Sequence, residues 1–303
     1  FPFALIFLLL FFSPSTGSGR GIQACTSHDL GQNFSKMFNI EFTDENKEQQ
    51  LVWQTSWGFT TRSIGISVMI HGDDKGLVLP PKVASYQVVI VPIIFKKSQE
   101  EVLAAAAKLR DTLVAAGVRC LLDDREGYKA PFKYNHWELR GVPLRIELGP
   151  KDIAKNACVT VRRDTKEKTF GVALDGIADS VKKLLDDIQA SMYKKADDEM
   201  KSRIITIKKW EDFVPNLNKK NLCISPWCGG IDCEKSIKKK TKEEGQKLAN
   251  DADDEFMLTA SAKSLCIPFD QKLAGEDLPE DKKCVNDECK NESNCWALFG
   301  RSY

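Results

Sequence analysis

The middle of the chain, residues 85–195, alternates apolar runs with amphipathic stretches. Tyr86 to Ile94 is an unbroken apolar run, which predicts a buried strand. A helix follows, in which Ser98 and Glu101 have the spacing of a capping box and Gly117 marks the end. Its expected apolar face consists of Val102, Ala105, Leu109, Leu113 and Ala116. Three more strands are predicted over 118–123, 144–148 and 157–161. A closing amphipathic helix carries Ile177, Val181, Leu184, Ile188 and Met192. This order predicts an α/β sheet with at least one parallel crossover.

Shorter elements are predicted in the preceding segment, residues 19–84. The apolar spacing over 30–38 fits a helix, and the alternation over 40–42 fits a strand. We expect a polar turn over 44–50 and a second strand over 51–54. The β-branched run 64–70 predicts a central strand that is covered on both faces. Pro80 and Pro81 predict the end of this unit.

The chain begins with an apolar run, FPFALIFLLLFF, followed by a linker of small residues. The run resembles the core of a signal peptide, but no positive segment precedes it and no clear A-x-A cleavage site follows. It is also shorter than the roughly 20 residues that span a membrane. We therefore expect residues 1–18 to be a truncated or misjoined end of the reading frame rather than a signal or an anchor.

Residues 196–303 have a different character. The run from Lys235 to Glu255 has many lysines followed by acids and almost no core-forming residues, which predicts a solvated helix or loop. Seven of the ten cysteines follow residue 200, and this dense cluster favours a metal site in a reducing compartment over a disulfide framework. The 44 basic and 43 acidic residues nearly cancel, so any contact with nucleic acid must come from a local patch.

Polar residues that could bind a ligand lie on both sides of residue 50. Arg62 heads an apolar run, and because a guanidinium keeps its charge and bonds in pairs to phosphate or carboxylate, it predicts an anion site. Taken alone, the cluster Gln23, Thr26, Ser27 and His28 is more often a turn or cap than a ligand site. Adjacent acids and glycines in HGDDKG, at His71, Asp73 and Asp74, predict an ordinary turn, and we expect His136 to be structural.

Two long motifs carry a family resemblance. QACTSHDLGQNFSK at 23–36 and SWGFTTRSIGISVMIHGDDKGLVLPP at 56–81 resemble the end of the catalytic domain of prolyl-tRNA synthetase, a class II aminoacyl-tRNA synthetase. The resemblance implies that Gln23 and Thr26 contact ATP and that His28 lies against bound proline. In SWGFTTRSIG, which looks like class II motif 3, it implies that Arg62 pairs with nucleotide phosphate and Thr60 binds near the adenosine. Trp57 would line the proline pocket, and Cys25 would crowd the site slightly.

The middle unit resembles the anticodon-binding domain of class II synthetases. The segments that carry this likeness are YQVVIVPI, FKYNHWELRGVPLRIELGPKDI and CVTVRRDT. The expected contacts with the anticodon stem-loop are Glu138, Arg140, Lys151, Arg162 and Arg163. Each of these arginines is equally compatible with a surface ion pair, which stabilises little.

The C-terminal cysteines suit tetrahedral thiolate binding of Zn²⁺. Cys228 and Cys233 bracket a glycine turn, and a second cluster begins at Cys284. The family's eukaryotic and archaeal-like branch carries such a site, and Cys289 is our choice of fourth ligand, with Cys295 as the rival. Some members of the branch keep the fold without metal. Three further residues receive structural roles, namely Cys223 and Cys266 in the core and Tyr303 packed toward the catalytic domain.

The resemblance defines four segments: 1–18 outside the family, 19–84 a partial antiparallel catalytic domain, 85–195 an α/β anticodon-binding domain and 196–303 a small α+β C-terminal domain. It implies a cytoplasmic proline–tRNA ligase that uses ATP, Mg²⁺, L-proline and tRNA(Pro), forms a homodimer and belongs to a multi-synthetase assembly, with no membrane contact. Motifs 1 and 2 are absent, so we expect the chain alone to be inactive. The alternatives are a non-catalytic tRNA-binding fragment or paralogue and, from the apolar start, a secreted disulfide-rich protein.

Overall fold

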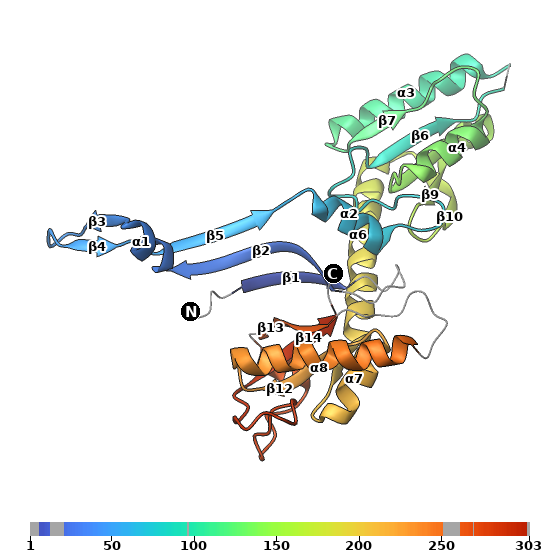
Figure 1. Cartoon of the computed structure of the whole chain (residues 1–303). Coiled ribbons are helices and arrows are strands. Elements are labelled where there is room, and N and C mark those ends of the chain that lie inside the picture. Colours follow the sequence, from blue (N-terminus) through green and yellow to red (C-terminus); the bar gives the residue numbers. More distant parts are fainter. Residues whose placement is uncertain (1–5, 13–20, 96, 251–260, 269, 302–303) are drawn as a thin grey trace. The chain divides into compact units, whose positions relative to one another are not determined.

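The computed structural model describes residues 6–12, 21–95, 97–250, 261–268 and 270–301. These residues form two compact units, each with its own contacts. One comprises the chain up to Ile66 together with Glu199 onward, and the other comprises Ser67–Asp198 (Figure 1). No helix within the described ranges is both long enough and apolar enough to span a membrane.

The second unit is built on a five-stranded sheet with the strand order β10-β9-β8-β6-β7. Its strands are β6 (Val88–Pro92), β7 (Cys120–Leu122), β8 (Leu144–Leu148), β9 (Ala157–Arg162) and β10 (Lys168–Ala173). β6 pairs in parallel with both β7 and β8, which confirms the expected parallel crossover. β9 and β10 extend the sheet in antiparallel pairs, and β10 was not predicted.

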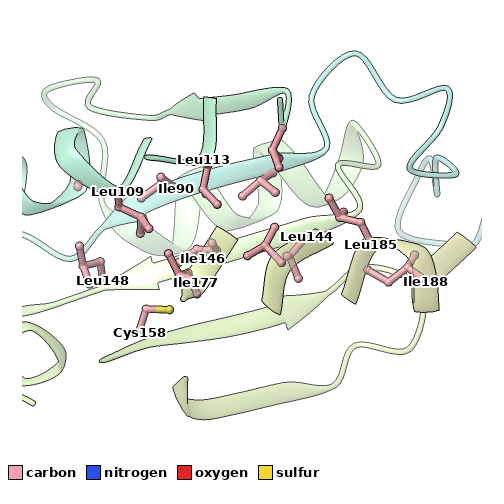
Figure 2. Close-up of a cluster of buried hydrophobic side chains, with 14 of the residues drawn as sticks. Ile90, Leu109, Leu113, Leu144, Ile146, Leu148, Cys158, Ile177, Leu185 and Ile188 are labelled. Carbon is pink, nitrogen blue, oxygen red and sulfur yellow. The ribbon is translucent and has the colours of Figure 1, made fainter. Parts of the chain in front are cut away.

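Helices cover the two faces of this sheet unequally. One face packs on α3 (Gln99–Ala115) and α6 (Ile177–Ser202), and the cluster between them includes Ile90, Leu144 and Ile146 (Figure 2). These strand residues alternate with Val89 and Val91, which face α4 (Ala130–Leu139) on the other side. The sheet is therefore sandwiched, as the apolar runs predicted. A short helix, α5 (Pro150–Ile153), follows β8.

The observed helices of this unit differ from the prediction in two details. Ser98 is the residue before α3, but its hydroxyl donates to the Phe95 carbonyl at 3.5 Å instead of capping the helix, so the predicted capping box is wrong. α4 was not predicted, because its polar and aromatic residues give little amphipathic periodicity. Gly117 ends α3 as expected, with a left-handed φ of 84°.

Residues 67–84 pack within the second unit, although the resemblance assigned them to the partial catalytic domain. The Leu77 and Leu79 amides donate to the carbonyls of Leu139 and Gly141, at 3.0 and 3.1 Å. Gly141 has a φ of 73°, and a Cβ there would lie 2.6 Å from the Leu77 carbonyl carbon. This close backbone contact ties the HGDDKG turn to the end of α4, in agreement with an architectural role for the turn.

The run 64–70 is helical rather than a central strand. It lies in α2 (Arg62–His71), so the strand prediction is wrong. Thr60 starts the helix, since its Oγ1 accepts from the Arg62 amide at 3.4 Å and its carbonyl accepts from the Ser63 hydroxyl at 2.6 Å. A short β-branched run cannot by itself be assigned to a strand or a helix, and this local start signal decides in favour of the helix.

The N-terminal residues form a three-stranded antiparallel sheet in the order β1-β2-β5 and a separate two-stranded hairpin. The strands are β1 (Ile6–Phe12), β2 (Gly21–Gly31), β3 (Glu41–Thr43), β4 (Gln49–Leu51) and β5 (Gln54–Phe59), and the helix is α1 (Asn33–Phe38). α1 confirms the helix predicted over 30–38. The single strand predicted over 51–54 is wrong, because Leu51 ends β4, Gln54 begins β5, and the two residues between them belong to neither strand. The apolar run at the start supplies β1, which pairs with β2.

The C-terminal residues form a four-stranded sheet in the order β11-β12-β14-β13, with helices packed against it. The elements are β11 (Ile204–Thr206), α7 (Trp210–Asn218), β12 (Leu222–Trp227), α8 (Ile231–Asn250), β13 (Ala262–Cys266), the 3-10 helix η1 (Gln271–Ala274) and β14 (Cys295–Arg301). α8 covers most of the lysine-rich run. It is helical as expected but not solvated all round, since Ile237 and Thr241 are buried. Tyr303 and residues 251–255 lie outside the described residues.

Candidate RNA-binding face and cysteine cluster

Helix α4 covers only part of one face of the sheet in the second unit. This helix packs on β6 and β7, and beyond it charged side chains replace apolar ones over β8 and β10. A cavity of about 240 Å³ lies there. Its polar lining consists of Lys75, Glu138, Arg145, Arg162, Arg163, Lys166 and Lys168, with Trp137 at its side. Six cationic residues and one acidic residue line this cationic cavity, so it favours an anionic ligand.

The floor of the cationic cavity is organised by Glu147, which is 2% exposed. Its carboxylate accepts from Arg145 at 3.0 and 3.1 Å and from Lys168 at 2.7 Å. The Arg145 guanidinium also lies 4.2 Å from the centre of the Tyr134 ring. One carboxylate thus holds two cations in place, and this arrangement leaves excess positive charge facing the cavity.

The predicted RNA contacts are distributed unevenly around this cavity. Arg163 has a side chain that is 3% exposed, and its guanidinium donates to Asp73 at 2.6 and 2.8 Å and to the Glu138 carbonyl at 2.9 Å. This bonding lowers the pKa of Asp73 and makes Arg163 a structural clamp, so the ion-pair alternative describes it better than direct RNA contact. Arg162 is also engaged, with Asp164 at 2.7 Å and Ser191 at 2.8 Å.

Glu138, Arg140 and Lys151 remain accessible to a ligand. Glu138 is 21% exposed on the cavity wall, 3.4 Å from Lys75. Arg140 is exposed, and its guanidinium lies 5.6 Å from the centre of the Trp137 ring. Lys151 is exposed on α5 and is not part of the cavity lining. Sequence reasoning missed Arg145 and Lys168, although the alternation LRIEL, with charges between buried leucines and isoleucine, could have indicated Arg145.

A buried carboxylate fixes α4 beside this cavity. Asp123 accepts from Arg125 at 2.7 and 2.8 Å and from the Trp137 indole nitrogen at 2.7 Å. Lys133 Nζ lies 3.7 Å from the carboxylate and donates to the Asp123 carbonyl at 2.8 Å. Burial would raise the pKa of Asp123, but these donors and charges outweigh it and lower the pKa to about 2. The carboxylate therefore stays ionised and anchors two successive turns of α4.

Four cysteines of the C-terminal unit converge as the sequence predicted. The sulfurs of Cys228, Cys233, Cys284 and Cys289 all lie within 4.8 Å of one another. Cys228 follows β12 directly, and Cys233 lies in the first turn of α8. The other pair lies on the loop before β14, where the Val285 amide donates to the Pro226 carbonyl at 2.8 Å. Cys295 is outside this set, and its thiol contacts the Trp227 carbonyl at 3.6 Å.

The geometry of this cysteine cluster fits a tetrahedral metal ion. Zinc–sulfur bonds of about 2.3 Å in a tetrahedron place sulfurs about 3.8 Å apart. Cys233 and Cys284 are 3.6 Å apart, and so are Cys228 and Cys289. The Gly230 amide donates to the Cys228 sulfur at 3.4 Å, and the Asn286 amide group donates to the Cys233 sulfur at 3.6 Å, which are bonds suited to thiolates. Burial raises the pKa of Cys228 to about 11, so a cation is needed to hold the thiolate form.

The residues expected to bind ATP and proline lie on and beside paired strands. β2 carries Gln23, Thr26 and His28, of which the structure describes only the backbone. In the register of β2 with β5, Thr26 lies opposite Gly58 and His28 lies opposite Ser56. This pairing brings the two sequence motifs next to each other along the chain's backbone.

Three more of these residues have described side chains, and all are exposed. Trp57 on β5 is 81% exposed. Thr60 and Arg62, at the start of α2, are also exposed. Cys25 on β2 is half-buried. An adenylate or proline pocket around these side chains therefore needs walls other than the ones that these elements provide.

Two stretches of the chain match known protein families. Residues 87–184 match the family described as anticodon binding domain, so the α/β unit belongs to that class of RNA-binding domains. Residues 210–303 match the family described as prolyl-tRNA synthetase, C-terminal.

Curated relatives agree with these matches over nearly all of the chain. A proline–tRNA ligase of Encephalitozoon cuniculi is 45% identical over 95% of this chain and 56% of the relative. A cytoplasmic proline–tRNA ligase of Arabidopsis thaliana is 42% identical over 96% of this chain and 51% of the relative. A bifunctional glutamate/proline–tRNA ligase of Drosophila melanogaster is 44% identical over 95% of this chain and 17% of the relative. The chain belongs to the prolyl-tRNA synthetase family, which is a family of enzymes, and it corresponds to the C-terminal portion. It spans about half the length of the single-function relatives, or less.

Proposed function

We propose that this chain carries the anticodon-binding and C-terminal portions, with the end of the catalytic domain, of a proline–tRNA ligase. The parent enzyme would activate L-proline with ATP and Mg²⁺ and transfer it to tRNA(Pro). The observation that carries the proposal is the cationic cavity in a domain that matches the anticodon-binding family. The exposed Lys166 and Lys168 at this cavity suit an RNA loop, because phosphates can meet these cations and a base edge can donate to Glu138.

Roles at the catalytic end follow from the family. We propose that Gln23, Thr26, Thr60 and Arg62 contact ATP and that His28 and Trp57 contact proline. Activation needs no covalent intermediate with the protein, because the carboxylate of proline attacks the α-phosphate. The protein therefore contributes positioning and electrostatic stabilisation. The exposure of Trp57 and Arg62 supports a pocket that is completed by other parts of the enzyme.

The cysteine cluster is proposed as a structural zinc site with Cys228, Cys233, Cys284 and Cys289 as ligands. Thiolate sulfurs at these separations leave no position for water or substrate, which is typical of a structural rather than a catalytic ion. Bound Zn²⁺ would stabilise the four thiolates and join the end of β12 to the loop before β14.

The relatives suggest the cellular setting. We propose a cytoplasmic enzyme, as the name of the Arabidopsis relative states for that protein. A homodimer remains an expectation from the family. The bifunctional name of the Drosophila relative supports association with a second synthetase activity.

The test of RNA binding uses the full 303-residue chain and transcripts of tRNA(Pro) and of a tRNA with another anticodon. We expect the chain to prefer tRNA(Pro). Lys166→Ala and Lys168→Ala should each weaken binding and reduce the salt dependence of log K by about one unit. Lys108→Ala, an exposed lysine on α3, is the matched control and should leave both unchanged. Equal affinity for the two transcripts, or an equal effect of the control, would refute the proposal.

The second candidate function is a tRNA-binding polypeptide without catalysis. The exposed positions of Trp57, Thr60 and Arg62 favour it for this chain alone. Purified chain should bind tRNA(Pro) and show no proline-dependent ATP–pyrophosphate exchange. Measurable exchange above a sample with Arg62→Ala would contradict this reading and assign activity to the 303 residues themselves.

A further inference from the structure

Helix α4 and the loop before it carry a row of aromatic rings, two of which are about half exposed. Phe132 and His136 are four residues apart on α4, so they lie one above the other along the helix, and Tyr128 lies in the loop just before α4. The ring centres of Tyr128 and Phe132 are 4.7 Å apart with planes at 16°, and those of Phe132 and His136 are 6.5 Å apart with planes at 22°. We call these three residues the aromatic ladder.

The ladder is not part of a hydrophobic core. Tyr128 and Phe132 are each 51% exposed, whereas Trp137 and Lys133 on the same helix are buried. Exposed aromatic rings in a contiguous row mark interaction sites more often than isolated ones do. The ladder therefore calls for a partner with flat apolar surfaces.

Two cavities flank the ladder. One end of the ladder, Tyr128, lines a second cavity of about 500 Å³ at the carboxyl ends of β6 and β7, together with Arg125 and Lys129. Its other end, His136, lies with its ring centre 4.9 Å from that of Trp137, which lines the cationic cavity. The ladder thus forms a continuous aromatic track from the second cavity to the proposed anticodon site.

The charges around the ladder suit a nucleic acid strand. The Arg125 guanidinium lies 5.4 Å from the centre of the Tyr128 ring, and Arg140 is exposed beyond the far end. Arg125 is bonded to Asp123, and Asp124 and Glu126 share its loop, so the exposed cations at the two ends of the ladder are Lys129 and Arg140. Alternation of aromatic faces with flanking arginines is how proteins hold unpaired nucleotides without reading their sequence.

We propose that the aromatic ladder is a stacking site for unpaired bases of the RNA whose anticodon enters the cationic cavity. The bases next to those in the cavity stack on Tyr128, Phe132 and His136, and their phosphates lie near Lys129 and Arg140. This inference rests on the proposed function. It adds a second, sequence-tolerant contact, because every base has an aromatic face.

The decisive measurement is the affinity of the full chain for an anticodon stem-loop hairpin of tRNA(Pro), by fluorescence anisotropy. Tyr128→Ala and Phe132→Ala should each weaken binding at least about fivefold, the lower end for loss of one stacked base. Phe132→Trp should retain binding because it keeps a flat aromatic face. Tyr193→Ala removes a ring that is 70% exposed on α6 and serves as the matched control, with affinity unchanged.

Two further readouts separate stacking from a general structural role. The slope of log K against log salt should stay the same in Phe132→Ala, because no phosphate contact is lost. With 2-aminopurine placed in the loop of the hairpin, binding of the parent chain should quench its fluorescence, and Phe132→Ala should abolish this quenching. A paired hairpin stem without unpaired bases should be insensitive to both ladder substitutions.

Each outcome has a distinct meaning. If Lys168→Ala weakens binding and the ladder variants do not, the ladder inference is wrong and the proposed function stands. The ladder inference is also wrong if the loss of affinity in the ladder variants is explained by a fall in their melting temperatures. It is equally wrong if Tyr193→Ala causes the same loss of affinity. Failure of the unsubstituted 303-residue chain to bind the hairpin at all would overturn the proposed function itself.

Discussion

The buried carboxylate of Asp123 offers the sharpest test of what holds the RNA-binding unit together. Asp123→Ala removes the acceptor of the Trp137 indole and the counter-charge of Lys133, whose side chain is 3% exposed. Loss of one partner of a buried ion pair costs about 3–5 kcal/mol, and an unsatisfied buried donor costs about 1–3 kcal/mol. Lys133 keeps one acceptor, the Asp123 carbonyl at 2.8 Å, because that group is backbone. We therefore expect a loss of about 4 kcal/mol in the free energy of unfolding.

The size of this loss should depend on Lys133. In Asp123→Ala combined with Lys133→Met no uncompensated ammonium remains, so the double variant should recover about half of the loss. Urea denaturation followed by circular dichroism gives the free energies, and hydrogen exchange of peptides from residues 123–148 assigns the transition to this unit. A loss below about 1 kcal/mol in Asp123→Ala would contradict the reasoning, since it lies under the cost of a single unsatisfied donor. An unchanged loss in the double variant would show that Lys133 is not the group left uncompensated.

Three other predictions concern acid, metal and backbone. Folding lowers the pKa of Asp123 to about 2, so the native form binds this proton less tightly than the unfolded chain does. The resulting stabilisation, about 2 kcal/mol, is complete above about pH 4 and is lost as the pH falls toward 2, and Asp123→Asn should flatten this part of an acid titration followed by circular dichroism. Elemental analysis should find about one zinc ion per chain. Cys233→Ser should abolish this zinc and Cys295→Ser should retain it, whereas zinc retained in Cys233→Ser would refute the ligand set. Gly141→Ala should destabilise the second unit by more than about 2 kcal/mol in urea denaturation, since its Cβ would lie 2.6 Å from backbone. Gly171→Ala, with a similar φ and open space, should cost only about 1–2 kcal/mol, and equal losses would contradict the packing argument.

The elements that could be predicted from the sequence are those with a strong period. The apolar run 86–94 became β6, and the amphipathic stretches became α3 and α6, because burial on one helix face or between two helical layers requires such patterns. The run 64–70 was assigned wrongly because β-branched residues fill a helix face as readily when a threonine begins the helix. α4 escaped prediction because its inward positions include Lys133, whose burial depends on a carboxylate brought by β7.

The candidate sites divide in the same way. The four cysteines could be chosen because a glycine turn between Cys228 and Cys233 has the spacing of a zinc ligand pair, and the fold brings all four sulfurs together. The bonding partners of the arginine side chains could not be predicted from the sequence. Arg163 and Arg145 look alike in sequence, but the tertiary fold gives Arg163 a bidentate partner in Asp73, 90 residues away, whereas Arg145 pairs with Glu147, two residues away, and lines the cavity.

The placement of the cysteine cluster also determines where the C-terminal domain can change in length. Cys228 is attached to the end of β12 and Cys284 to the loop before β14, and these two strands pair directly with each other. Cys233 and Cys284 are 51 positions apart in the sequence, and the chain between them leaves and returns at the same place, so its length does not affect the positions of the sulfurs. Insertions and deletions after the first turns of α8 should therefore be tolerated in related proteins. Insertion or deletion of a single residue between Cys228 and Cys233, or between Cys284 and Cys289, should not be tolerated.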